Sequence, residues 1–414
     1  MTFRRASALL TVVFAAVAGL SAQSASSVAD RAAALHKTVP VIDGHNDYPW
    51  ALREKSPGRD LNVLDIRQPQ PSLMTDISRL RAGGVGGQFW SVYVPSTMQG
   101  KEAVRATLEQ IDIVHRMVAK YPETFVLTRT ADDVERAFKA GKIGSMIGME
   151  GGHSIDSSLA TLRMMHALGA GYMTLTHSSN VPWADSATDT PALGGLSPFG
   201  EAVVREMNRL GMLVDLSHVS PDTMADAIRV SKAPVIFSHS SARAVCDHPR
   251  NVPDEILTQL PANGGVVMVT FVPGFIAPEA GKLYPQTSAM MRQMAEKYAD
   301  DPAGMRAARA EWRKTHPEPK ATLSMVADHI DHIRKVAGID HIGLGGDFDG
   351  IDTVIAGLED VSKYPALTAE LLRRGYSDDD VKKILGLNIL RVMRRAEAVA
   401  VSMKGEPPSV AVDK

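Results

Sequence analysis

Eight short apolar runs recur along the chain, and segments of helical length separate most of them. The runs are 39–43, 87–94, 143–149, 171–176, 211–216, 233–237, 265–270 and 341–345. Strands that alternate with helices are typical of a parallel sheet covered by its helices. Eight such units predict a closed (β/α)8 barrel of the TIM type, with a doubly wound open sheet as the alternative. A ninth run, 125–128, is expected to be a side strand or a loop.

The length of 414 residues suits one such barrel with an added segment. We expect an N-terminal lead-in at 23–35, a barrel domain at 36–397 and a polar C-terminal tail at 398–414. The added segment is a helical insertion near 276–320, in which 290–298 and 303–313 have helical patterns. We expect this insertion beside the mouth of the barrel, as a lid or a dimer contact.

Residues 1–22 have the pattern of a secretory signal peptide. Arg4 and Arg5 precede an apolar run that ends in small residues near Ala22. This run is shorter than the ~20 apolar residues that a membrane-spanning helix needs. The sequence therefore predicts an exported protein, periplasmic or secreted, that is soluble after cleavage and has no stable membrane anchor.

Charge and cysteine content exclude several classes of site. The 45 Lys and Arg residues nearly balance the 47 Asp and Glu residues, and no long basic run offers a surface for nucleic acid. The single cysteine, Cys246, excludes an intrachain disulfide and a multi-cysteine metal cluster. A bound metal would therefore have to be held by His, Asp and Glu.

Side chains that can bind a metal stand at the ends of six of the eight runs. They are His45, Asp47, Glu150, His177, His218, His239 and Asp347. Because the C-terminal ends of parallel barrel strands meet at one mouth, we expect these side chains to converge there. The sequence therefore predicts a metal site at the mouth of the barrel.

Five of these residues are the expected metal ligands: His45, Asp47, Glu150, His218 and His239. Five nitrogen and oxygen ligands are more than one open tetrahedral zinc site needs. A carboxylate has two oxygens and can bridge two ions. We therefore expect two metal ions that share Glu150.

The remaining polar groups near the strand ends suggest catalytic and binding roles. His177 is expected to donate a hydrogen bond to developing negative charge, with metal ligation as the alternative. Asp347 is expected to transfer protons, with Asp349 as the alternative. The planar fork of Arg250 would suit a substrate carboxylate.

Three other histidines are not among the expected metal ligands. His153 is expected to support Glu150 or its loop. His329 and His332 are three residues apart on a predicted helix, and we expect them on its polar face.

Seven segments, in chain order, carry a recognisable pattern. They are 42–50 (IDGHNDYPW), 148–153, 175–185, 215–220, 237–241, 250–254 and 345–350. Together they closely resemble the membrane dipeptidase family, also called renal dipeptidase or peptidase family M19, over about residues 36–397. The resemblance implies a metal-dependent barrel of the amidohydrolase type with two zinc ions per chain. It also implies hydrolysis of dipeptides with free termini, including those with a D-residue at the C-terminal side, by a hydroxide that bridges the two zinc ions.

The resemblance also implies a role for each matching residue. His45, Asp47 and Glu150 would hold one zinc, and Glu150, His218 and His239 the other. His177 matches the residue that stabilises the scissile carbonyl oxygen, Arg250 the one that meets the substrate carboxylate, and Asp347 the one that manages protons.

The chain departs from the animal members of that family. Ser178 and Ser179 stand where a cysteine is expected, so a disulfide-linked dimer of the animal kind is not expected, while a homodimer stays open. Two other functions also stay open. One is another metal-dependent amidohydrolase acting on β-lactams or lactones, and the other is an exported protein that binds peptides without cleaving them.

Overall fold

The computed structural model describes residues 27–298, 301–317 and 319–413. The predicted signal peptide, 1–22, lies outside the described residues. Nine parallel strands form one sheet in the order β2-β1-β9-β8-β7-β6-β5-β4-β3. Strand β2 also pairs with β4, so eight strands close into a barrel and β3 lies outside it. This confirms the predicted (β/α)8 barrel and excludes the open sheet.

Each of the eight predicted runs overlaps a barrel strand. The strands are β1 Val41–Asn46, β2 Val85–Ser91, β4 Ile143–Glu150, β5 Ala170–Thr174, β6 Leu213–Asp215, β7 Ile236–Ser240, β8 Val266–Val269 and β9 Ile342–Leu344. The ninth run is the side strand β3, Phe125–Leu127. Strands β1, β4 and β7 extend far enough to include His45, Glu150 and His239. These three side chains are therefore held by the sheet itself and not by a loop.

The strands are apolar because the sheet is covered on its outer face and filled on its inner face. Every residue of β1, β2 and β4 is buried. Tyr172 of β5 fills the space beside Gly148 of β4, where an added Cβ would lie 2.1 Å from the tyrosine ring. A glycine on β4 thus makes room for an aromatic ring and its hydroxyl inside the barrel.

Helices surround the barrel. They are α1 Val28–Leu35, α2 Tyr48–Lys55, α3 Ile77–Ala82, α4 Gly100–Lys120, α5 Ala131–Lys139, α6 Leu159–Ala167, α7 Pro198–Leu210, α8 Pro221–Val230, α9 Asp254–Leu257, α10 Leu260–Asn263, α11 Pro273–Ile276, α12 Pro278–Lys297, α13 Pro302–Thr315, α14 Leu323–Val336, α15 Tyr364–Arg373, α16 Asp378–Lys382 and α17 Asn388–Ser402. Ser197 and Ser220 cap α7 and α8, each accepting a backbone N–H at the third helical residue, with a proline at the first.

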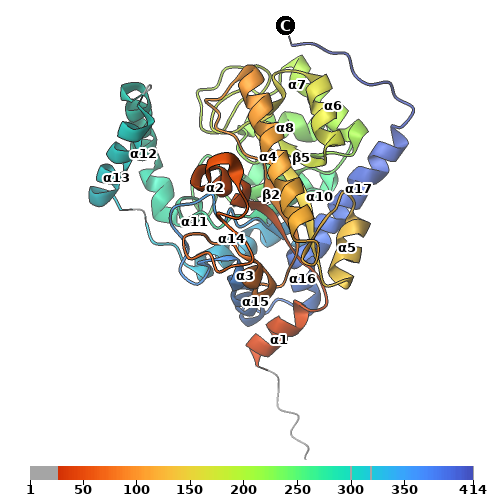
Figure 1. The fold of residues 1–414 in the computed structure, drawn as a ribbon, viewed down its shortest axis with the longest axis vertical. Coiled ribbons are helices and arrows are strands. Elements are labelled where there is room, and N and C mark those ends of the chain that lie inside the picture. The colour runs from red at the N-terminus through yellow and green to blue at the C-terminus, as the bar shows by residue number, and fades with distance from the viewer. Residues whose placement is uncertain (1–26, 299–300, 318, 414) are drawn as a thin grey trace, which may run out of the picture.

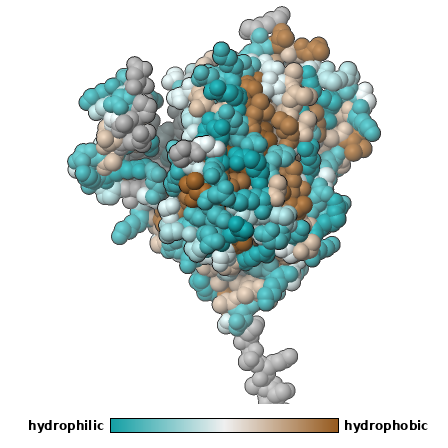
Figure 2. Space-filling view, in the orientation of Figure 1, coloured by the Kyte–Doolittle hydropathy of each residue, from teal (hydrophilic) through white to brown (hydrophobic). Residues whose placement is uncertain are grey.

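Most of the face in Figure 2 is hydrophilic, and hydrophobic residues gather beside α4. None of the helices in the described ranges combines the length and apolar character needed to cross a membrane.

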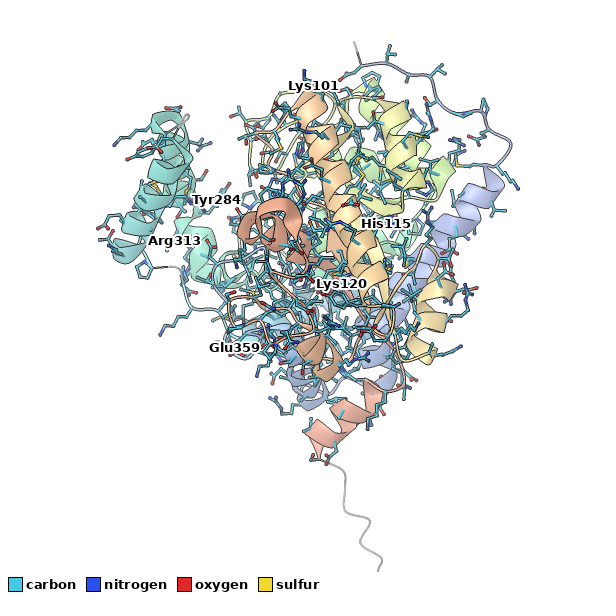
Figure 3. All side chains as sticks on the ribbon, viewed as in Figure 1. Lys101, His115, Lys120, Tyr284, Arg313 and Glu359 are labelled. Carbon is cyan, nitrogen blue, oxygen red and sulfur yellow. The ribbon has the colours of Figure 1, made fainter. Side chains whose placement is uncertain are left out.

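The insertion forms two helices, α12 and α13, that stand away from the barrel (Figure 1). Both predicted helical segments are confirmed, and α12 begins earlier than expected, at Pro278. Figure 3 labels Tyr284 on α12 and Arg313 on α13. The ring of Tyr284 lies 4.3 Å from that of His248, and Arg313 forms a 2.8 Å ion pair with Asp352. Because Asp352 belongs to the cavity wall described below, the insertion lies beside the mouth of the barrel.

Candidate metal centre

A cavity of about 390 Å³ opens at the C-terminal ends of the strands. Its wall includes seven of the eight predicted site residues: Asp47, Glu150, His177, His218, His239, Arg250 and Asp347. The eighth, His45, is fully buried behind Asp47 and Glu150. The structure therefore brings together all eight residues that the strand-end pattern and the family resemblance selected. A cavity of this size is typical of a site for a small molecule.

The first group of candidate ligands surrounds Nε2 of His45. This atom lies 3.3 Å from Asp47 Oδ2 and 3.4 Å from Glu150 Oε2, and it is buried without a hydrogen bond to any of the described residues. Burial acts to lower the pKa of His45, but Tyr172, Glu150 and Asp47 outweigh it and raise the pKa well above its usual value. Two carboxylates that face one buried nitrogen favour a cation between them, which fits a divalent metal.

The second group surrounds Oε1 of Glu150. His218 Nε2 lies 2.9 Å and His239 Nε2 3.4 Å from this oxygen, and the two nitrogens are 3.0 Å apart. Burial, aided by the charge of Arg250, lowers the pKa of both histidines well below the usual value. Two neutral imidazoles that converge on one carboxylate oxygen are a typical zinc donor set.

Glu150 connects the two groups, because its Oε2 faces His45 and its Oε1 faces His218 and His239. Burial acts to raise the pKa of this carboxyl, but His45, His177 and the hydrogen bonds outweigh burial and hold the pKa well below its usual range. An ionised carboxylate with one oxygen toward each group has the geometry of a bridging ligand.

His177 and Asp347 lie beside these two groups. His177 Nε2 is 3.7 Å from Glu150 Oε1, and burial lowers the pKa of this histidine to about 4. The backbone N–H of Asp347 donates to the carbonyl of His45 over 3.1 Å. Burial, together with Asp47 and Glu150, raises the pKa of the Asp347 carboxyl well above its usual range. A carboxyl with a raised pKa at this position suits proton transfer.

Arg250 is a buried cation on the cavity wall, 3% exposed. Its Nη2 donates to the carbonyl of His239 over 3.3 Å, and its guanidinium lies 5.2 Å from the ring of Phe275. Among the described residues, no carboxylate forms an ion pair with it, and burial lowers its pKa to about 10. An unpaired buried guanidinium that faces a cavity is suited to an anion such as a carboxylate.

Asp349, the alternative to Asp347, holds the backbone in place. Its Oδ1 accepts the N–H of Met74 over 2.6 Å, and burial raises its pKa to about 6. His153 joins its loop to the segment after β2, since its Nε2 lies 3.1 Å from the carbonyl of Val94, and it has no hydrogen bond to Glu150 among the described residues.

The expectation for His329 is wrong. This residue is fully buried, its Nδ1 accepts the N–H of Ala242, and its Nε2 lies 3.1 Å from the carbonyl of Ile276. His332 is only partly buried, and its Nε2 lies 2.7 Å from Asp254. His329 therefore joins α14 to the segment after β7 and to the end of α11, whereas His332 lies nearer the surface as expected.

Sequence reasoning missed the aromatic side of the cavity, which Trp50, Tyr93 and Phe275 form. The rings of Trp50 and Tyr93 meet edge to face at 5.0 Å, and Tyr93 lies 5.0 Å from the ring of His177. Tyr93 stands just beyond the end of β2. The rule that selects metal-binding side chains at strand ends, here called the strand-end rule, would have found it if aromatic residues had been included.

Comparison with known proteins shows that nearly the whole chain is similar to proteins of one family. Residues 29–407 match the family described as membrane dipeptidase (peptidase family M19). The chain is 42% identical to dipeptidase verJ of Clonostachys rogersoniana, covering 88% of this chain and 86% of the relative. It is 43% identical to dipeptidase 3 of Rattus norvegicus, covering 92% of this chain and 70% of the relative.

Solved structures share the fold. The probable dipeptidase PvdM from Pseudomonas aeruginosa matches with a TM-score of 0.77 at 27% identity, over 90% of this chain and 99% of that one. A metallopeptidase of family M19, dipeptidase AC, matches with a TM-score of 0.72 at 25% identity, over 87% of this chain and 99% of that one.

Proposed function

This chain belongs to the membrane dipeptidase family, peptidase family M19, and from its place among these metallodipeptidases we propose a two-zinc enzyme that hydrolyses free dipeptides. The observation that carries the proposal is the unpaired Arg250, whose Nη2 lies 3.3 Å from the carbonyl of the candidate ligand His239. A substrate carboxylate on Arg250 would therefore place the adjacent amide bond beside the metal ligands. We include dipeptides with a D-residue at the C-terminal side, because the family resemblance implies them.

The donor set fits two zinc ions. His45, Asp47 and Glu150 would hold one, and Glu150, His218 and His239 the other. When bound, the ions would supply a water of lowered pKa as the nucleophile and polarise the scissile carbonyl.

The residues of the chain would manage the protons and the developing charge. Ser178 Oγ lies 2.7 Å from Nδ1 of His177, and donation by this hydroxyl leaves the proton of the neutral ring on Nε2. Nε2 can then donate a hydrogen bond to the carbonyl oxygen as negative charge develops on it. Asp347, whose pKa burial raises, would hold the proton released by the nucleophile and pass it to the leaving amine.

The test is a panel of substrates offered to the zinc-loaded protein. It contains L,L and L,D dipeptides, an N-blocked dipeptide, a tripeptide, a β-lactam and a lactone. We expect cleavage of the free dipeptides only. Faster turnover of the lactone or the β-lactam would favour another amidohydrolase, and zinc binding without any turnover would favour a peptide-binding protein.

Asp347→Asn is the matched variant for this panel, because the amide keeps the shape of the side chain but cannot accept a proton. We expect it to retain both zinc ions and to lose about 10²- to 10⁴-fold in kcat, the usual contribution of a general acid or base. Activity near that of the unaltered protein would contradict the role of Asp347.

We also propose that the protein is exported after removal of residues 1–22, on the pattern of Arg4, Arg5 and the following apolar run. N-terminal sequencing of protein recovered from the periplasm or the medium would test this. A mature chain that still begins at Met1 would contradict it.

A further inference from the structure

We propose that Asp215 positions a metal ligand: through the hydroxyl of Ser238, it keeps the proton of His239 on Nδ1 and so presents Nε2 to the metal. Asp215 is the last residue of β6, Ser238 and His239 lie on β7, and all three are buried. The inference rests on the proposed metal site and concerns how this chain prepares that site.

The carboxylate of Asp215 accepts four hydrogen bonds. Its Oδ1 accepts the backbone N–H groups of Ser217 over 3.1 Å and of Ser238 over 2.8 Å. Its Oδ2 accepts the hydroxyls of Thr174 over 2.5 Å and of Ser238 over 2.6 Å. Because the oxygens of a carboxylate accept hydrogen bonds, both hydroxyls point their hydrogens toward Oδ2.

The direction of the next hydrogen bond follows from this. Ser238 has a single hydroxyl hydrogen, and Asp215 Oδ2 at 2.6 Å is a much closer acceptor than Ser217 Oγ at 3.4 Å. Nδ1 of His239 lies 2.8 Å from Ser238 Oγ and must therefore be the donor. A neutral imidazole has one N–H, so Nε2 keeps its lone pair.

That lone pair points into the candidate metal site, where His239 Nε2 lies 3.4 Å from Glu150 Oε1 and 3.0 Å from His218 Nε2. A hydrogen bond from the distal nitrogen toward a carboxylate fixes the orientation of a metal-binding histidine and makes it a stronger ligand. Of the other two candidate histidine ligands, His45 has only the Tyr172 hydroxyl at Nδ1, and Nδ1 of His218 is buried without a hydrogen bond in the described part of the chain.

A purely structural role is the competing explanation, because the same carboxylate also joins β5 to β6 and β7. Thr174 separates the two explanations. Its hydroxyl donates to the same oxygen as that of Ser238, at nearly the same distance, but Thr174 has no contact with His239 among the hydrogen bonds of the described residues. Thr174→Val and Ser238→Ala thus remove equivalent bonds from Asp215, and only the second breaks the connection to the metal ligand.

The experiment measures zinc affinity of the full chain by competition with a chromophoric chelator, without substrate. We expect Ser238→Ala to weaken zinc binding by about 10- to 100-fold, the usual effect of removing the hydrogen-bond partner of a metal-binding histidine. Thr174→Val should bind zinc nearly as the unaltered protein does, and Ser238→Thr, which restores a hydroxyl, should recover the affinity. With Co²⁺ in place of zinc, the visible absorption bands should shift in Ser238→Ala and not in Thr174→Val.

Two outcomes would overturn the proposal: unchanged zinc affinity in Ser238→Ala, or an equal loss in Thr174→Val. Asp215→Asn, which keeps the shape of the side chain, is the second variant if Ser238→Ala does not fold, and it should weaken zinc binding in the same range. Intact zinc uptake with no dipeptide hydrolysis in the unaltered protein would refute the proposed function and leave this inference standing.

Discussion

The hydroxyl of Tyr172 on β5 lies 2.9 Å from Nδ1 of His45 on β1, across the barrel between strands that are not neighbours. The same hydroxyl donates to the carbonyl of Gly44 over 3.1 Å, so it accepts the Nδ1 proton of His45. Nε2 of the histidine is thereby directed toward Asp47 and Glu150. The core of the barrel thus determines the orientation of a candidate ligand at its mouth.

Tyr172→Phe should therefore affect both stability and metal binding. The change leaves a buried N–H and a buried carbonyl without their partner, which costs about 1–3 kcal/mol each in the free energy of unfolding. Zinc affinity should fall by about 10- to 100-fold, because His45 loses the group that orients it. Urea unfolding and chelator competition measure the two effects.

Tyr121→Phe is the control for this variant. Tyr121 is also buried, its hydroxyl donates to Asp65 over 2.9 Å, and neither residue lines the cavity. This variant should lose stability without losing zinc affinity. If both variants bind zinc equally well, Tyr172 has no part in orienting His45.

Glu150→Ala should remove both metal ions and not one. Oε2 of Glu150 faces His45, and Oε1 faces His218 and His239, so its loss takes a ligand from each group. Metal analysis after dialysis measures the zinc content of each protein. Glu54→Ala is the matched control, because Glu54 lines the same cavity but is exposed at its rim, and it should retain both ions. Retention of two zinc ions by Glu150→Ala would refute the bridging role.

The strand-end rule predicted the candidate site well because it depends only on topology. In a parallel barrel, the last residues of all strands meet at one mouth whatever the intervening loops contain. The rule therefore found His218 and His239 without knowledge of a single contact.

Groups inside the barrel could not be predicted in the same way. Tyr172 reaches His45 because Gly148 on the next strand leaves room for its ring, and that match depends on the strand register. His329 was expected on a polar helix face because histidine counts as polar in a periodic pattern. Its ring can be buried because each of its nitrogens forms a hydrogen bond with a backbone group, of Ala242 or of Ile276. Only the tertiary structure brings these two groups to the ring.

Arg250→Met should reduce activity on free dipeptides while zinc content stays unchanged. Loss of a hydrogen bond to a charged group costs about 1.5–3 kcal/mol, which corresponds to a fall of about 10- to 150-fold in kcat/KM. A dipeptide amide, which lacks the carboxylate, should be a poor substrate for both proteins and should show little further loss. Arg250→Lys keeps the charge without the planar fork and should be intermediate. An equal loss on the free dipeptide and its amide would contradict carboxylate recognition by Arg250.

Asp349→Asn should change how the stability of the metal-free protein depends on pH. Burial raises the pKa of Asp349 to about 6, above the value of about 3.9 expected in the unfolded chain. A group with a raised pKa stabilises the fold at low pH, and this stability is lost as the pH rises through the folded-state value. Between pH 4 and pH 7 ionisation of this carboxyl should therefore lower the free energy of unfolding of the unaltered protein by about 2 kcal/mol. The asparagine can still accept the N–H of Met74 but carries no charge, so the variant should avoid this loss. Urea unfolding of both proteins in chelator at the two pH values measures the difference, and identical pH dependence would show that Asp349 does not ionise in this range.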